Sequence, residues 1–329
     1  MGFNISNLAA KLQENIADYT KIYALKLSNG FNAKSDPLFT VLPIVDKVPL
    51  IREITTPILQ PGRKGTTNFS SGEHDLKNRE GVLKPFKADL KLTEVQLYGY
   101  SKTYLAKKSP TDPNDVYSAP AMDHYMNAIM RQAGKDTHSA LYKGVLNSAG
   151  TGAVDIADGL EIKLLQGIAT TGTGFVGDIP VANQTTAAAT INQANILSEI
   201  NALVLVIING LDNALEEDGC LCIDPILYVH LINALNASLS NGSQVVYRDG
   251  AELRLAALPN TVVRAKSWLK GTSKLLWTVN GNFFFLTPES TSDVPSIQVE
   301  KADRSIKIFM DGEIGFDYAD GRMIFMNSK

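Results

Sequence analysis

The chain has 329 residues, of which 44% are hydrophobic and 20% are charged, and its formal net charge is −3 at pH 7. This composition is typical of a folded globular protein, and it excludes a disordered chain and a chain that binds polyanions over its whole surface. No apolar run approaches the roughly 20 residues that a membrane-spanning helix needs. Residues 1–30 lack the basic and apolar regions of a signal peptide. Only two cysteines occur, which excludes a disulfide framework, and we expect folding in a reducing cytoplasm.

Residues 1–50 are expected to form an extended N-terminal arm. Prolines recur between residues 37 and 61, and proline at this density interrupts both helices and central strands. An arm of this kind would bury apolar side chains such as Phe39 and Leu42 against a neighbouring subunit. The alternative is an irregular segment that wraps around its own core.

Residues 51–93 are predicted to form a projecting loop of two extended runs. The runs Ile51–Leu59 and Val82–Leu92 flank a polar stretch, Gln60–Gly81, that has no regular apolar spacing. An excursion of roughly 40 residues with so little core of its own is unusual within a compact domain. We therefore expect it to reach across a neighbour.

The charges are unevenly distributed along the chain. Residues 52–91 contain eight Lys/Arg and five Asp/Glu, a balance of +3, whereas residues 151–240 contain one Lys/Arg and ten Asp/Glu, a balance of −9. One interpretation is chance segregation of solvated charge, and the other is that opposite faces of two copies meet. On the second interpretation the contacts between subunits would include four basic side chains of the loop: Arg63, Lys64, Lys77 and Arg79.

A long helix, which we call the spine helix, is predicted over residues 119–149. Ser118 is suited to the N-cap of this helix and Pro120 to its first turn. Gly150 is suited to the position that ends the helix. A helix of roughly 28 residues would span about 42 Å, which is enough to connect distant parts of an elongated subunit; the alternative is a long helix lying across a sheet. One stripe at helical spacing carries its apolar face: Met122, Tyr125, Met126, Ile129, Met130, Ala133, Thr137, Ala140, Leu141 and Val145.

A second unit of helix, strand and helix follows. Apolar residues recur at helical spacing over Ile196–Glu217, and Leu205 with Val206 widens the stripe, which predicts a helix buried on most sides. Cys220–Ile223 is predicted to be a buried strand. Asp224 followed by Pro225 is typical of an N-cap and a first helical residue, so a helix is predicted over Ile226–Leu239.

The remainder of the chain is predicted to be strands. Asn280-Gly281 favours a type I′ turn, which predicts a hairpin between Lys274–Val279 and Asn282–Thr287. Asp311-Gly312 and Asp320-Gly321 are expected to be turns between C-terminal strands. The other predicted strands are Val245–Tyr247, Glu252–Leu255, Thr261–Ala265, Ser305–Met310, Glu313–Tyr318 and Arg322–Met326.

No catalytic constellation stands out, and we expect neither an enzyme nor a bound cofactor. The four histidines, His74, His124, His138 and His230, are scattered, and none has a second ligand at metal spacing. Cys220 and Cys222 should share one strand face; without a second pair, core packing is favoured over a zinc site. The glycines between residues 172 and 177 lack the lysine and the strand–helix context of a phosphate loop.

The order of these elements resembles the major capsid protein of tailed bacteriophages, the Hong Kong 97-type capsid fold that also occurs in encapsulin. The segment from Ile196 to Leu239 resembles the apical domain of that fold, and Lys274–Thr287 with Ile297–Met326 is similar to its terminal strands. The resemblance implies an α+β fold with an N-terminal arm, an extended two-stranded loop, a long spine helix, and peripheral and apical domains. The implied divisions are the arm at 1–50, the extended loop at 51–93, the peripheral domain at 94–195, the apical domain at 196–286, and C-terminal strands at 287–329 that return to the peripheral domain.

The function that this resemblance implies is structural. The chain would assemble with itself, as hexamers and pentamers, into the icosahedral head of a double-stranded DNA phage, after synthesis in the host bacterial cytoplasm. Portal, scaffold and decoration proteins are possible partners. The chain would bind DNA only through weak non-specific contacts, and no membrane association is expected. Two alternatives stay open: an encapsulin-like shell around protein cargo, and a soluble ligand-binding domain with its site in the Ala169–Thr190 stretch.

Overall fold

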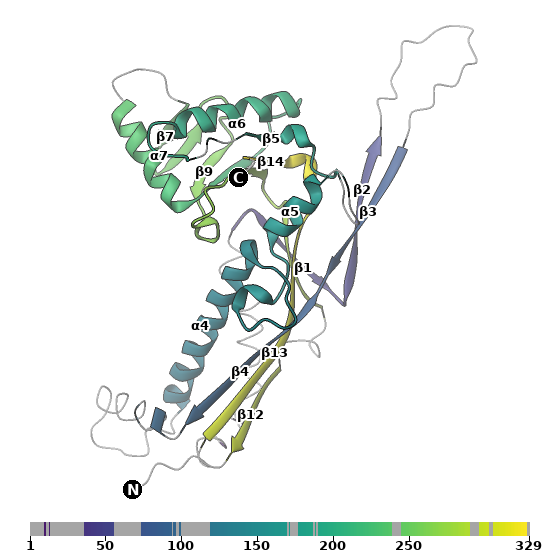
Figure 1. Cartoon of the computed structure of the whole chain (residues 1–329), viewed down its shortest axis with the longest axis vertical. Helices are drawn as coiled ribbons and strands as arrows, with labels where there is room; N and C mark the ends of the chain where they lie inside the picture. The colour runs from purple at the N-terminus through teal and green to yellow at the C-terminus, as the bar shows by residue number, and fades with distance from the viewer. Residues whose placement is uncertain are drawn as a thin grey trace, which may run out of the picture.

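The computed structural model describes residues 36–55, 74–93, 119–169, 177–186, 190–238, 245–289, 296–302 and 305–327, with a few isolated positions outside these ranges. Figure 1 shows an elongated molecule with three parts. A compact upper part holds one sheet and two helices, a long limb combines one helix with long strands, and a two-stranded ribbon projects away from both.

The upper part is built on a seven-stranded sheet in the order β5-β14-β10-β6-β9-β8-β7. The helices α6 (Ile196–Gly210) and α7 (Pro225–Ser238) share one core with Leu221 and Ile223 of the central strand, so both cover the same face of the sheet. Cys220 and Cys222 point to the opposite face and belong to the core that joins the upper part to the limb. The strands are β5 (Gln184–Thr185), β6 (Gly219–Ile223), β7 (Val246–Asp249), β8 (Glu252–Leu255), β9 (Val262–Ala265), β10 (Leu275–Val279) and β14 (Ile324–Asn327).

The limb is built on a five-stranded sheet in which β13 (Ser305–Tyr318) pairs with β11, β12 and β4. Along β4, apolar side chains alternate with charged ones, and the apolar side chains pack toward the shared core. Helix α4 (Ala119–Lys143) runs beside these strands, and α5 (Leu160–Ile168) lies near its C-terminal end. The other strands are β1 (Phe39–Ile44), β4 (Lys84–Thr93), β11 (Phe283–Pro288) and β12 (Ser296–Ala302).

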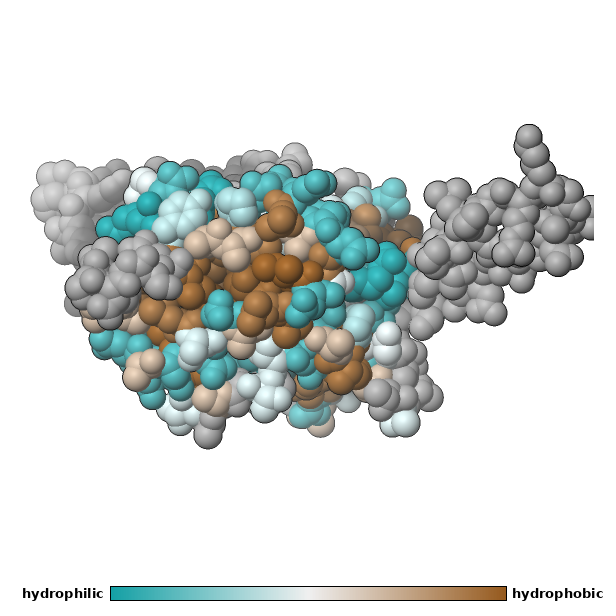
Figure 2. Space-filling model, turned by 90° about the horizontal axis from the view of Figure 1, so that it is seen from above, coloured by the Kyte–Doolittle hydropathy of each residue, from teal (hydrophilic) through white to brown (hydrophobic). Residues whose placement is uncertain are grey.

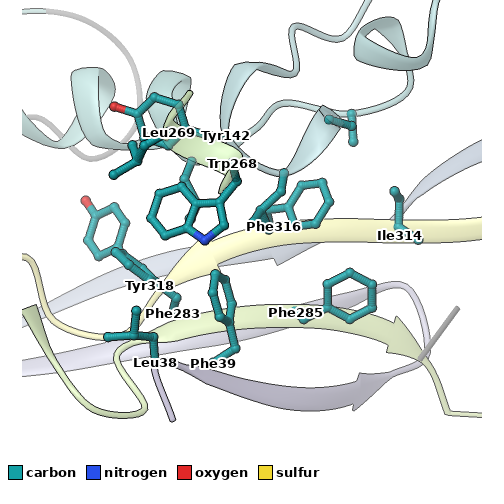
Figure 3. Packing of buried hydrophobic residues seen from close by; sticks show 14 of the residues in the cluster. Leu38, Phe39, Tyr142, Trp268, Leu269, Phe283, Phe285, Ile314, Phe316 and Tyr318 are labelled. Atoms are coloured by element: carbon teal, nitrogen blue, oxygen red, sulfur yellow. The ribbon is translucent and has the colours of Figure 1, made fainter. Parts of the chain in front are cut away.

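Four aromatic residues from four segments pack where the two parts meet (Figure 3). Trp268 lies in a short 3-10 helix after β9, and its ring centroid is 5.5 Å from that of Tyr142 on α4 and 6.2 Å from that of Phe39 on β1. Phe283 of β11 completes the group, 6.4 Å from Trp268. All four side chains are buried, so this contact fixes the limb to the upper part. The short 3-10 helices are η2 (Ala153–Asp155), η3 (Val181–Asn183), η4 (Ser267–Leu269) and η5 (Gly321–Met323).

The ribbon consists of β2 (Lys47–Thr55) and β3 (His74–Val82), paired antiparallel. The predicted two-stranded excursion is therefore present, but its returning strand is His74–Val82 and not Val82–Leu92. The latter stretch is β4, which pairs with β13 in the limb. The segment before Gly81 showed no apolar alternation, because it pairs with β2 through its backbone and its buried side chain at the ribbon base is the charged Arg79.

The expected arm is also corrected where the structure describes it. Residues 36–44 pack on their own subunit, because β1 lies parallel to β11 and Lys266 Nζ is 2.6 Å from the Asp36 carboxylate. Leu38 and Ile44 are buried within the subunit. The alternative of a segment wrapped on its own core holds for this stretch, and residues 1–35 lie outside the described ranges except for two isolated positions.

The spine helix is present, but it ends at Lys143 and not at residue 149. After Gly144 the backbone N–H groups of Val145 and Asn147 donate to the carbonyls of Val154 and Asp155, at 2.8 and 3.0 Å, instead of to the preceding helical turn. Val145 of the predicted stripe is therefore exposed, whereas Met126, Met130 and Leu141 are buried as predicted. Likewise α6 ends at Gly210 and not at Glu217, since Phe325 of β14 packs against Gly210 and the chain then turns.

The predicted hairpin around Asn280-Gly281 is wrong. Both strands exist, but β10 pairs with β6 and β14 in one sheet, whereas β11 pairs with β1 and β13 in the other. Gly281, with a φ of 75°, passes the chain between the sheets, and its N–H donates to the Pro37 carbonyl at 2.7 Å. The chain does turn at Asn280-Gly281, but the turn is not of type I′, because Gly281 has a positive φ and Asn280 does not. Each strand finds its partners elsewhere.

Two further expectations for the C-terminal strands are corrected. Asp311-Gly312 is not a turn, because these residues continue β13 opposite Lys87 and Phe86 of β4. The last strand, β14, joins the seven-stranded sheet beside β10 rather than returning to the limb with β12 and β13. In the part of the chain that the structure describes, no helix is both long and apolar enough to span a membrane.

Candidate assembly surfaces

A buried cluster of charged residues fixes the base of the ribbon to the subunit. Arg52 of β2 donates from Nη1 to the Asp178 carbonyl at 2.8 Å and also to the Asp178 carboxylate. Arg79 of β3 lies 3.4 Å from the other oxygen of that carboxylate and 3.5 Å from the carboxylate of Asp317 on β13. Two cations therefore meet two anions, and the side chains of Arg79, Asp178 and Asp317 are all 5% exposed or less.

The surroundings of the cluster are also buried and polar. The Arg79 guanidinium carbon lies 3.8 Å from the centroid of the Tyr318 ring, and Nη2 donates to the Ala319 carbonyl at 3.3 Å. Burial raises the pKa of Asp317, and the charges of Arg79 and Lys163 act against that rise. A cavity of about 450 Å³ lies beside the cluster, between β3, α5 and β13. Because a buried charge without a partner is strongly destabilising, each member of the cluster depends on the others.

The outward face of α6 and α7 is apolar and carries almost no charge. We call it the α6/α7 face and define it by four side chains, Leu205, Ile208, Ile226 and Val229, which are 39–57% exposed. Neither Lys, Arg, Asp nor Glu occurs in α7, and α6 contains only Glu199. Figure 2 shows hydrophobic side chains gathered on this end of the molecule. Charge depletion at the centre of an exposed apolar surface is typical of protein–protein interfaces.

The structure places the six predicted contact residues in different settings. Phe39 is buried in the subunit's own core, and Arg79 is in the buried cluster, so neither lies on a free surface of the subunit. Leu42 is partly buried against a small apolar cluster at the ribbon base. Lys77 lies on β3 opposite Arg52, whereas Arg63 and Lys64 fall outside the described residues. Contact of Lys77, Arg63 and Lys64 with a neighbour stays a prediction.

Sequence reasoning missed both Asp178 and the α6/α7 face. Asp178 lies in the Ala169–Thr190 stretch, which we considered as the site of a ligand-binding domain, and only the folded chain brings it to Arg52 and Arg79. The α6/α7 face did leave a signal. The apolar stripe widens at Leu205, and we interpreted this width as burial, although Leu205 is 54% exposed. The lack of charged residues across residues 225–238 was a second sign of the α6/α7 face.

The residues considered for chemistry do not come together. His138 of α4 lies 2.9 Å from the Ser267 hydroxyl, and burial lowers its pKa. Cys220 and Cys222 share one face of β6 as predicted, with their sulfur atoms 3.9 Å apart, and both are free thiols in the core. Within the described ranges, no group of three or more His, Cys, Asp or Glu side chains is placed to hold a metal ion.

Comparisons of sequence found no matching family model and no matching curated protein. Among solved structures, a chain of the satellite phage P4 procapsid, a structure that includes the size determination (Sid) protein, covers 94% of this chain and 97% of its own length, at 10% identity and a TM-score of 0.54. The chain has a phage capsid fold. This confirms, at the level of the fold, the resemblance drawn from the order of the elements.

Two other solved structures are similar to this chain with lower TM-scores. A capsid chain of cyanophage P-SCSP1u covers 89% of this chain and 86% of its own length, at 12% identity and a TM-score of 0.49. A chain of the holo-SrpI encapsulin complex from Synechococcus elongatus covers 88% of this chain and 84% of its own length, at 10% identity and a TM-score of 0.44.

Proposed function

We propose that this chain is the major structural subunit of a bacteriophage head and that copies of it assemble into an icosahedral shell around double-stranded DNA. The observation that carries the proposal is the fold shared with the P4 procapsid chain over nearly the whole length of both chains. The role is association rather than catalysis. The proposed partners are further copies of the chain in hexamers and pentamers, together with portal, scaffold and decoration proteins and weakly bound DNA.

The subdomains of the Hong Kong 97-type fold are assigned under the same proposal. The ribbon of β2 and β3 is the extended loop, and α4 with the five-stranded sheet is the peripheral domain. The seven-stranded sheet with α6 and α7 is the apical domain. Two observations support this assignment: the two sheets have separate strand sets, and the ribbon pairs with neither of them.

The proposal gives the α6/α7 face a role as a contact between copies. Burying a whole Val, Leu or Ile side chain contributes about 1.5–3 kcal/mol. Each of the four side chains here still exposes 39–57% of its surface, so covering it contributes on the order of 1 kcal/mol. A few kcal/mol at each repeated contact is enough to favour a closed assembly of many subunits over free subunits.

The test is the assembly state of the purified full-length chain. We expect sedimentation velocity to show large particles whose share rises with protein concentration, and negative-stain microscopy to show closed shells. A well-folded monomer at every concentration and salt tested would contradict the proposal. If shells form, nucleic acid that survives nuclease treatment inside them supports a genome container, whereas a protein cargo without nucleic acid would indicate a compartment shell instead.

A further inference from the structure

We propose that Asp178 sets the direction of the β2–β3 ribbon on the subunit before any neighbour is present. It acts as a positioning residue, through Arg52 and Arg79. The consequence for assembly rests on the proposed function. The position of the ribbon itself is a property of the single chain and can be tested without a shell.

The ribbon meets the body at two successive places along its length. Nearest the body, Val48 packs against the small cluster of Ile44, Leu83 and Leu286. A Cβ added at Gly81, which pairs with Val48, would lie 3.0 Å from Leu286, so the ribbon passes close to β11 there. This first place alone would act as a pivot, because a single apolar contact does not define an angle.

The second place lies further along both strands. Asp178 meets both strands there, whereas Asp317 and the Ala319 carbonyl meet only β3, through Arg79. Arg52 is four residues beyond Val48 on β2, which corresponds to about 13 Å at roughly 3.3 Å per residue. One carboxylate oxygen of Asp178 meets Arg52 and the other meets Arg79, so a single side chain holds both strands of the ribbon. Two separated attachments fix a direction where one would not.

Burial makes this second attachment hard to release. The Arg79 and Asp178 side chains are each 5% exposed, and freeing the ribbon would leave buried charges without partners. The ribbon also offers an exposed ion pair for comparison. Lys47 and Glu80 are 3.4 Å apart with side chains 55% and 58% exposed, and pairs of this kind contribute little. Loss of the buried Asp178 carboxylate should therefore release the ribbon, whereas loss of the exposed Glu80 carboxylate should not.

The experiment measures the spread of ribbon positions by pulsed electron paramagnetic resonance on the unassembled full-length chain. Spin labels are attached at Thr55→Cys, the last residue of β2, and at Leu215→Cys, which is 58% exposed. The native thiols are buried and should not react. We expect a narrow distance distribution in the labelled parent and at least a twofold wider one with Asp178→Asn. Glu80→Gln, the matched control, should leave the width unchanged.

A narrow distribution in a folded Asp178→Asn variant would overturn the proposal. If that variant fails to fold, the Arg52→Gln variant tests the proposal instead, because Asp178 then still binds Arg79 and only the strand β2 is released. A distance distribution as narrow as that of the parent would again overturn the proposal. Where shells form, Asp178→Asn should yield particles of mixed diameter while Glu80→Gln does not. If the parent forms no shells, the proposed function fails but the distance measurement still decides the role of Asp178.

Discussion

Among single residues, Asp320 shows how one carboxylate organises the turn before the last strand. It accepts from the Arg322 backbone N–H at 2.9 Å and forms an ion pair with the Arg322 side chain at 2.6 Å. The Asn282 amide donates to the Asp320 carbonyl at 3.0 Å. Burial would raise the pKa of Asp320, but the bonds and charge of Arg322 outweigh it, so the pKa lies below its usual value of 3.8.

This lowered pKa predicts an acid-dependent contribution to stability. A carboxylate with a lowered native pKa stabilises the fold above its usual pKa, and the contribution is lost as the pH falls through the native pKa. Asp320→Asn should be less stable than the parent at pH 5 by about 1 kcal/mol, a figure kept small because solvent screens the half-exposed Arg322. The difference should shrink as the pH falls below 3.8 and Asp320 becomes protonated in the native state. Urea unfolding across this range measures it, and a difference that does not change with pH would contradict the account.

Single residues also show what sequence can and cannot predict. The cap by Asp224 was predictable, because its partner is two residues away: its carboxylate accepts from the Ile226 N–H at 2.9 Å. The role of Asp178 was not, because its partners lie about a hundred residues away along the chain. Local patterns identify contacts that the backbone itself brings together, whereas the ionic cluster at the ribbon base exists only in the folded chain.

Among the elements, α4 contains one glycine, Gly134, and is followed directly by another, Gly144, and the two have opposite requirements. A Cβ at Gly144 would lie 2.3 Å from the Ala157 carbonyl oxygen and 2.5 Å from that of Ala140, both fixed backbone atoms. At Gly134, inside the helix, nothing lies within 4 Å of the added Cβ. Only the first glycine is therefore required by the packing of the chain.

The two substitutions should change stability in opposite directions. Gly144→Ala should destabilise the subunit by at least about 2 kcal/mol, because backbone atoms must move. Gly134→Ala should stabilise it by up to about 1 kcal/mol, as alanine favours the helix. Chemical unfolding of the two variants in parallel measures both effects. A neutral Gly144→Ala would show that the helix does not need to end where η2 packs against it.

The elements also show where sequence patterns fail. The long helix α4, the helices α6 and α7 and most strands were predictable from periodicity and capping residues. The separation of β10 and β11 into two different sheets was not, because Asn280-Gly281 specifies a turn but not the partner of each strand. The continuity of β13 through Asp311-Gly312 was missed for the same reason. Asp311 pairs with both β12 and β4, and Gly312 pairs with β4, so both residues are kept extended by strands distant in sequence.

For the whole molecule, the account predicts that one end of the subunit is covered in the assembly. Val229 is 57% exposed on α7, a helix that contains no Asp, Glu, Lys or Arg. Val229→Glu should leave the unfolding free energy within about 0.5 kcal/mol of the parent, as is usual for surface substitutions. The particle yield should fall at least tenfold, because the carboxylate would be desolvated at the contact.

The matched control for this prediction is Val229→Thr, which keeps the branched shape and adds no charge. Its particle yield by light scattering should stay within a fewfold of the parent. Equal yields for the parent and both variants would remove the α6/α7 face from the contact surface. Loss of folding in Val229→Glu would instead show that the side chain supports the subunit's own core.

The most direct test of the central claim is a cryo-electron microscopy reconstruction of particles formed by the purified full-length chain. The account predicts a closed icosahedral shell in which the β2–β3 ribbon lies over a neighbouring subunit and the α6/α7 face is buried between copies. Particles without closed symmetry, or a shell in which the ribbon and the α6/α7 face both remain exposed to solvent, would contradict it.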